Sequence, residues 1–92
     1  MKIKTECLFI EVAEGAEMKK NADGNRVATG KKEHKAILYP SGQDSFHGVI
    51  SALIPPEVLE RTRALVMKKA EFILEQITVK GFTFYEYVGV SA

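Results

Sequence analysis

The alternation of apolar and polar residues predicts strands over most of the chain. Lys2–Val12 alternates with a period of two and is apolar on both faces at its middle, which indicates a strand with a buried centre. Lys31–Tyr39 begins charged and ends apolar, and Asp44–Ile54 follows it after the turn-forming residues 40–43. These two segments are therefore expected to pair as a hairpin.

Two more strands are predicted near the carboxyl end, at Lys69–Val79 and Phe82–Val90, joined by the two-residue turn Lys80-Gly81. Between the first two strands, Ala13–Gly30 has no clear periodicity and contains several turn-forming residues, among them the pair Asp23-Gly24. This segment is predicted to be a long, mobile, basic loop or a flexible hairpin tip.

One helix is expected, at Glu57–Met67. It follows Pro55-Pro56, which ends the preceding strand because proline cannot donate to a ladder. Apolar residues form one stripe along it: Val58, Leu59, Thr62, Leu65 and Val66.

The predicted order favours an all-β fold with one helix, a five-stranded OB-fold Greek-key barrel with the helix between strands three and four. The alternative is an SH3-like barrel, which has a similar strand count but a single helical turn before its last strand. The length of the predicted helix, eleven residues, favours the OB-fold.

Size and composition indicate one domain over residues 1–92. If the 92 residues were divided between two domains, each would be too small to bury a core. No apolar run approaches the roughly 18 residues that cross a bilayer, and the start of the chain lacks a signal-peptide pattern, so we expect a cytoplasmic protein. Cys7 is the one cysteine, which excludes an intramolecular disulfide, and its apolar neighbours predict a buried thiol.

The formal net charge is only +1, but the charge is unevenly distributed. Residues 18–35 carry six cations against two acidic residues, and such a local basic segment attracts an anionic partner even when the total charge is small. The six cations are Lys19, Lys20, Arg26, Lys31, Lys32 and Lys35.

Aromatic residues accompany this basic segment. Tyr39 shares a predicted strand face with Lys31 and Lys35, and Phe46 is expected near it across the hairpin. Single-strand binders combine a positive groove with aromatic rings on which bases stack. Tyr39 and Phe46 are therefore candidates for stacking.

The last strand is the densest aromatic run in the chain. We expect Phe82, Phe84, Val88 and Val90 to face the core, so that Tyr85 and Tyr87 point outward. For these two tyrosines, stacking on bases, contact with a second protomer and ordinary cross-strand packing all remain open.

Catalytic patterns are scarce. The sequence has no glycine-rich phosphate loop and no nucleophile elbow, so we predict no enzyme activity and no cofactor. The expected hairpin register pairs Tyr39 with Asp44 and His34 with about Val49, which would bring His34 near His47. A metal site or a histidine–aspartate relay is thus an alternative to two ordinary strand histidines.

The order of several segments along the chain carries a family resemblance. A glycine- and lysine-rich segment (residues 24–32) precedes a strand ending in Leu38-Tyr39, and Ile54-Pro55-Pro56-Glu57, Lys69-Ala70-Glu71-Phe72 and an aromatic closing strand follow. This pattern resembles the small OB-fold single-stranded DNA-binding proteins of phages and conjugative elements.

The resemblance implies a sequence-tolerant, non-catalytic protein that binds single-stranded DNA during replication, as a homodimer and without a cofactor. A replication protein is the further partner that it suggests. The basic residues of segment 19–35 would contact phosphates. The near-neutral total charge departs from this pattern, because non-specific binding depends mainly on phosphate neutralisation. The alternative is a protein-interaction module or accessory subunit whose closing strand adds to a partner's sheet.

Overall fold

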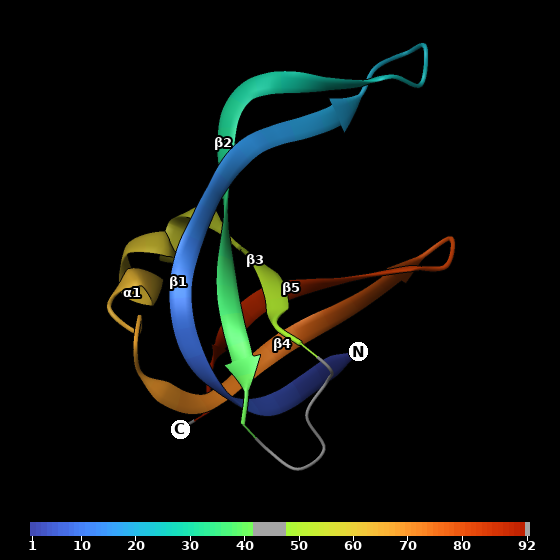
Figure 1. Cartoon of the computed structure of the whole chain (residues 1–92). Coiled ribbons are helices and arrows are strands. Elements are labelled where there is room, and N and C mark those ends of the chain that lie inside the picture. The colour runs from blue at the N-terminus through green and yellow to red at the C-terminus, as the bar shows by residue number, and fades with distance from the viewer. Residues whose placement is uncertain (42–47, 92) are drawn as a thin grey trace.

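The computed structural model describes residues 1–41 and 48–91. It contains five strands, a turn of 3-10 helix and a short α-helix (Figure 1). Their bounds are β1 Lys2–Lys20, β2 Arg26–Pro40, β3 Ile50–Ile54, η1 Pro56–Val58, α1 Leu59–Arg63, β4 Lys69–Val79 and β5 Phe82–Val90.

The strands close into a barrel in the order β1-β2-β3-β5-β4. All neighbouring pairs are antiparallel except β3 and β5, which run parallel at two residue pairs, Ala52 with Tyr85 and Leu53 with Glu86. A five-stranded Greek-key barrel with a helix between the third and fourth strands is the OB-fold, and the predicted fold class is confirmed.

The barrel interior is a small apolar core to which every strand contributes. Phe72 lies at its centre, with its ring centroid 5.8 Å from that of Phe9 and 6.2 Å from that of Tyr87. Cys7 is buried here, as its apolar neighbours predict, and burial raises the pKa of its thiol. The core residues are Cys7, Phe9, Ala36, Leu38, Ile50, Ala52, Ile54, Phe72, Leu74 and Tyr87.

The segment Ala13–Gly30, expected as a loop or hairpin tip, is mostly strand. β1 runs on to Lys20 and β2 begins at Arg26, so that residues 21–25 form the tip of a long hairpin. The side chain of Asn21 accepts hydrogen bonds from the backbone N–H groups of Asp23 and Asn25, and Gly24 has φ of 82°, a left-handed conformation that glycine adopts without strain.

The long β1–β2 hairpin bends sharply away from the barrel (Figure 1). The β1–β2 register shifts between Phe9 and Glu11 and again between Ala16 and Met18. Such irregularities bend a strand and obscure the alternation of its side chains, which explains why the sequence pattern is lost there.

The predicted helix Glu57–Met67 is wrong in its length, since only Leu59–Arg63 is α-helical. Met67 adopts φ of 69° and donates its N–H to the carbonyl of Phe9, while the N–H of Phe9 donates to the carbonyl of Lys68. Residues 67 and 68 are therefore already bonded to β1, which ends the helix early. Within the described chain, no helix has the length and apolarity needed to span a bilayer.

The predicted register of the β2–β3 hairpin is also wrong. His34 pairs with Ile54, not with Val49, and Leu38 pairs with Ile50. The connection between the strands is therefore longer than the four-residue turn expected from Pro40 to Gln43. Asp44, Phe46 and His47 lie outside the described residues.

The two faces of β5 are the reverse of those expected. Tyr87 is 5% exposed and packs on Phe72, whereas Phe82 and Phe84 are 69% and 56% exposed. Burial raises the pKa of the Tyr87 hydroxyl, and the neighbouring Thr62 side chain acts in the opposite direction. Val88 and Val90, also assigned to the core, are likewise exposed.

Candidate nucleic-acid interface

Two hairpins project from the same side of the barrel, β1–β2 above and β4–β5 below in Figure 1. Between them lies a groove of about 300 Å³ whose back is formed by β3 and the adjoining part of β2. Its lining includes Arg26, Lys35, Leu53, Ile77, Phe84 and Glu86. In OB-folds, the β2–β3 face and the loops β1–β2 and β4–β5 are the usual ligand-binding surface.

The lower wall of the groove is apolar and aromatic. Ile77 pairs with Phe84 and Val79 with Phe82 across the β4–β5 hairpin, so that these four side chains share one face of the ribbon. All four are exposed. They form an apolar surface on a projecting hairpin, although the groove lining itself includes only Ile77 and Phe84 of the four.

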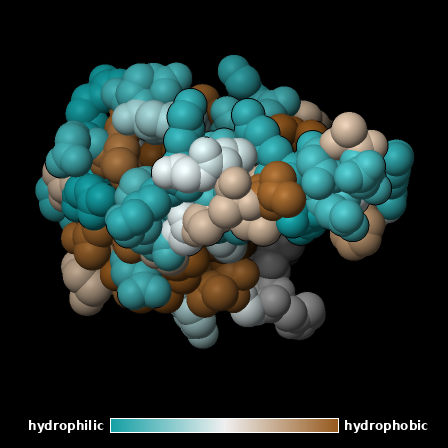
Figure 2. Space-filling view, turned by 90° about the horizontal axis from the view of Figure 1, so that it is seen from above, coloured by the Kyte–Doolittle hydropathy of each residue, from teal (hydrophilic) through white to brown (hydrophobic). Residues whose placement is uncertain are grey.

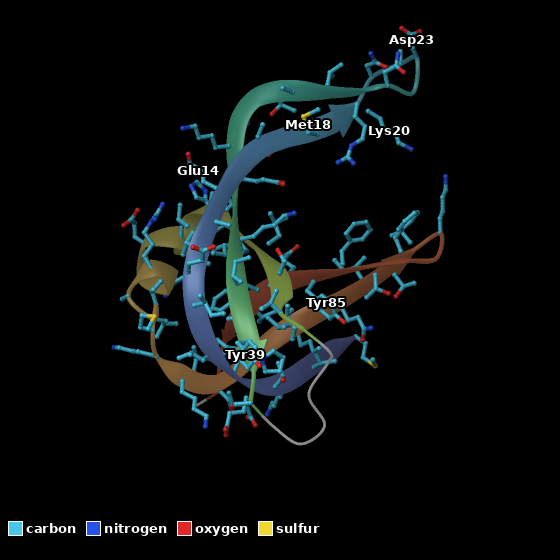
Figure 3. All side chains as sticks on the ribbon, viewed as in Figure 1. Glu14, Met18, Lys20, Asp23, Tyr39 and Tyr85 are labelled. Carbon is cyan, nitrogen blue, oxygen red and sulfur yellow. The ribbon has the colours of Figure 1, made fainter. Side chains whose placement is uncertain are left out.

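The upper wall is cationic. Lys20 and Arg26 pair directly across the tip of the β1–β2 hairpin and so lie on the same face, and Arg26 lines the groove. Figure 3 shows Lys20 extending from the underside of this hairpin toward the β4–β5 hairpin. Seen from above, the end of the molecule near this hairpin tip is mainly hydrophilic (Figure 2).

Several lysines of the β1–β2 hairpin are neutralised by acidic residues of the same hairpin. Lys32 Nζ lies 2.9 Å from a carboxylate oxygen of Glu14, and His34 Nε2 lies 3.0 Å from the other oxygen. The hydrogen bond from Lys32, then that from His34, lowers the pKa of Glu14, and Glu14 raises the pKa of Lys32. These contacts are too exposed to contribute much stability.

The six predicted cations thus separate into distinct groups. Lys20, Arg26 and Lys35 gather around the groove, although Lys35 Nζ also lies 3.8 Å from a Glu33 oxygen. Lys31 and Lys32 line another shallow hollow that also includes Glu14, and Lys32 in addition lines a hollow next to the groove, near α1. Lys19 pairs with Val27, one position before the Lys20–Arg26 pair. Because successive side chains of a strand point to opposite faces, Lys19 lies on the other face of the hairpin.

The predicted aromatic residues lie in different parts of the molecule. Tyr39 is 54% exposed, as the strand pattern predicts, but it lies at the far end of β2 and does not line the groove (Figure 3). Tyr85 lines the groove while packing partly against the core. Tyr87 is buried, and its outward orientation is a wrong prediction. Phe46 falls outside the described part of the chain.

Sequence reasoning missed Phe84, Phe82 and Ile77. A signal for them is present in the sequence. The two-residue turn at Lys80-Gly81 fixes the hairpin register and places Phe84 on the same face as Glu75 and Glu86. A face that carries two charged residues is expected to contact solvent, so it cannot be the core face.

A second hollow continues the groove toward α1. It shares Glu33, Leu53 and Glu86 with the groove and extends to Pro55 and Leu59. Together the two form one depression that crosses the outer face of β3. An extended ligand lying between the hairpins would therefore have room to continue toward the helix.

The alternative of a metal site or a histidine–aspartate relay concerns His34 among the described residues. No group of three or more histidine, cysteine or acidic side chains in residues 1–41 and 48–91 has the arrangement of a metal site. The contact of His34 with Glu14 gives this histidine a surface partner. The expected relay partners Asp44 and His47 cannot be placed, since they lie in the segment that is not described.

Comparisons with protein-family models, with curated proteins and with solved structures gave no match for this chain. The geometry of the groove is therefore the basis for assigning a function.

Proposed function

We propose that this protein binds single-stranded DNA in the groove between its β1–β2 and β4–β5 hairpins. One observation carries the proposal: an exposed phenylalanine, Phe84, faces the same groove as the cations Arg26 and Lys35. Bases have apolar faces and phosphates are anionic, so a strand in this groove could stack on the lower wall while its backbone meets the upper one.

The number of available cations limits the strength of binding. Three cations gather around the groove, and each phosphate neutralised on a single strand contributes a slope of about −0.7 to the dependence of log K on log salt. We therefore expect a total slope of about −2, whereas full use of all six cations would give about −4. Modest affinity that weakens with salt is consistent with the near-neutral total charge.

The test is a fluorescence-anisotropy titration of a labelled single-stranded oligonucleotide at several salt concentrations. Saturable binding with a slope near −2 supports the proposal, and a duplex of the same sequence should bind more weakly because its bases cannot stack on Phe84. An absence of binding at low salt would contradict it. A role in phage or mobile-element replication, and association as a homodimer, rest on the sequence resemblance and stay predictions; light scattering tests the second.

The alternative of a protein-interaction module receives less support. Strand addition needs a free edge, and the edge of β5 that faces away from β4 is interrupted by its pairing with β3 at Tyr85 and Glu86. Its tyrosines, which suggested an adhesive strand, also turn inward.

A further inference from the structure

The groove contains a carboxylate that an anion-binding site would not be expected to hold. Glu86 lies on the same strand face as Phe84, about 7 Å further along β5. It pairs with Leu53 of β3 at the back of the groove, and it also lines the hollow that continues toward α1. A DNA strand that follows this depression would pass Glu86.

This carboxylate is not neutralised within the part of the chain that the structure describes. The neighbouring acidic residues have cationic partners: a Glu33 oxygen lies 3.8 Å from Lys35 Nζ, and a Glu75 oxygen lies 3.2 Å from the amino terminus. Glu86 has no such ion pair among the described residues. A negative charge is thus left at the back of the groove, where it repels phosphates and attracts hydrogen-bond donors.

Hydrogen-bond donors on a single strand lie on the base edges. An ionised carboxylate only accepts hydrogen bonds, and a glutamate accepts well from the amino group of cytosine. The equivalent edge of thymine or uracil carries one N–H between two carbonyl oxygens, so a carboxylate that accepts from this N–H is repelled by the carbonyl oxygens on either side. In a single strand these edges are free to bind protein.

We propose that Glu86 selects for bases that carry an amino group, so that the groove prefers cytosine to thymine within otherwise sequence-tolerant binding. This inference rests on the proposed function, because it requires a base stacked at Phe84. A good side-chain contact to a base edge corresponds to roughly a tenfold discrimination.

The test compares oligocytidine and oligothymidine of equal length at mildly alkaline pH, where cytosine is unprotonated. The two are both pyrimidines, so that stacking differs little between them. The unchanged protein is expected to bind oligocytidine about tenfold more tightly. In Glu86→Gln, oligothymidine should bind more tightly than before, and the ratio of the two affinities should approach one.

Glu60→Gln is the matched control, because it removes the same charge from α1, outside both hollows. It should leave the ratio unchanged. Equal affinities in the unchanged protein, or an unaltered ratio in Glu86→Gln, would overturn the inference while leaving single-strand binding in place. If neither oligomer binds at low salt, the proposed function fails, and the selectivity fails with it.

Discussion

The two projecting hairpins are built alike but present opposite chemistry to the groove. The β1–β2 hairpin is polar, and ion pairs such as Lys32 with Glu14 neutralise part of its positive charge. The β4–β5 hairpin exposes the cross-strand pairs Ile77–Phe84 and Val79–Phe82, with threonines on its reverse face. A lone surface phenylalanine needs no explanation, but four apolar side chains on one face of a projecting ribbon indicate a contact surface.

This difference suggests a division of roles. The upper hairpin would supply long-range attraction, limited by its own acidic residues, and the lower hairpin would supply contact with bases. Variants of the two hairpins should then have different effects on binding. Substitutions in the β1–β2 hairpin should alter the salt dependence of the affinity, and substitutions in the β4–β5 hairpin should alter the affinity at all salt concentrations.

The largest expected effect is on the free energy of unfolding, and it distinguishes the two faces of β5. Tyr87→Ala should lower the free energy of unfolding by about 3 kcal/mol or more, because it opens a cavity beside Phe72. Phe84→Ala should cost less than about 1 kcal/mol, the scale of one cross-strand contact. Chemical denaturation measures both, and comparable losses would contradict the face assignment of β5.

The next effect concerns base contact. Phe84→Ala should weaken oligonucleotide binding by about tenfold or more, since one aromatic stack contributes roughly 1–3 kcal/mol. The salt slope should stay unchanged. Val88→Ala, which changes another exposed residue further along β5 and outside the groove lining, serves as the control. An anisotropy titration in which both variants bind as tightly as the unchanged protein would show that the lower wall is not part of the binding site.

A smaller effect is expected from the upper hairpin. Lys20→Gln should reduce affinity a few-fold and make the salt slope shallower by about 0.7, the contribution of one phosphate contact on a single strand. Lys19→Gln makes the same charge change on the opposite face of the same ribbon and should alter neither quantity. Equal effects of the two would show that only total charge matters.

The smallest effect tests the internal neutralisation of the upper hairpin. The pKa of Glu14 should lie below its ordinary value of 4.5, because Lys32 and His34 stabilise the carboxylate. The ion pair therefore makes its full contribution to stability above pH 4.5, and this contribution is lost as the pH falls through the lowered pKa. NMR titration should show the midpoint of Glu14 rising toward 4.5 in Lys32→Gln, and an unchanged midpoint would contradict the ion pair.

The fold was predictable from strand spacing, although one supporting argument was wrong. β4 and β5 were predicted with their observed bounds because a two-residue turn and regular alternation define them. The long helix that favoured the OB-fold is absent, since residues 67 and 68 bond to β1. The strand order and the parallel contact of β3 with β5 identify the fold instead.

The candidate site was harder to predict. Local sequence shows which residues are cationic, but the pairing of Lys32 with Glu14 and the separation of Lys19 from Lys20 depend on the register of the bent hairpin. Phe84 was missed because its apolar character suggested burial. The charged residue on the same face, Glu86, was the contrary signal.

The most direct test is NMR mapping of the backbone amides during titration with a short single-stranded oligonucleotide. The groove predicts that the largest shifts occur at Lys20, Arg26, Ile77 and Phe84, on both hairpins together. Residues Lys19 and Lys31 should move little. Shifts confined to one hairpin, or centred on the hollow around Lys31, would contradict a binding site between the two hairpins.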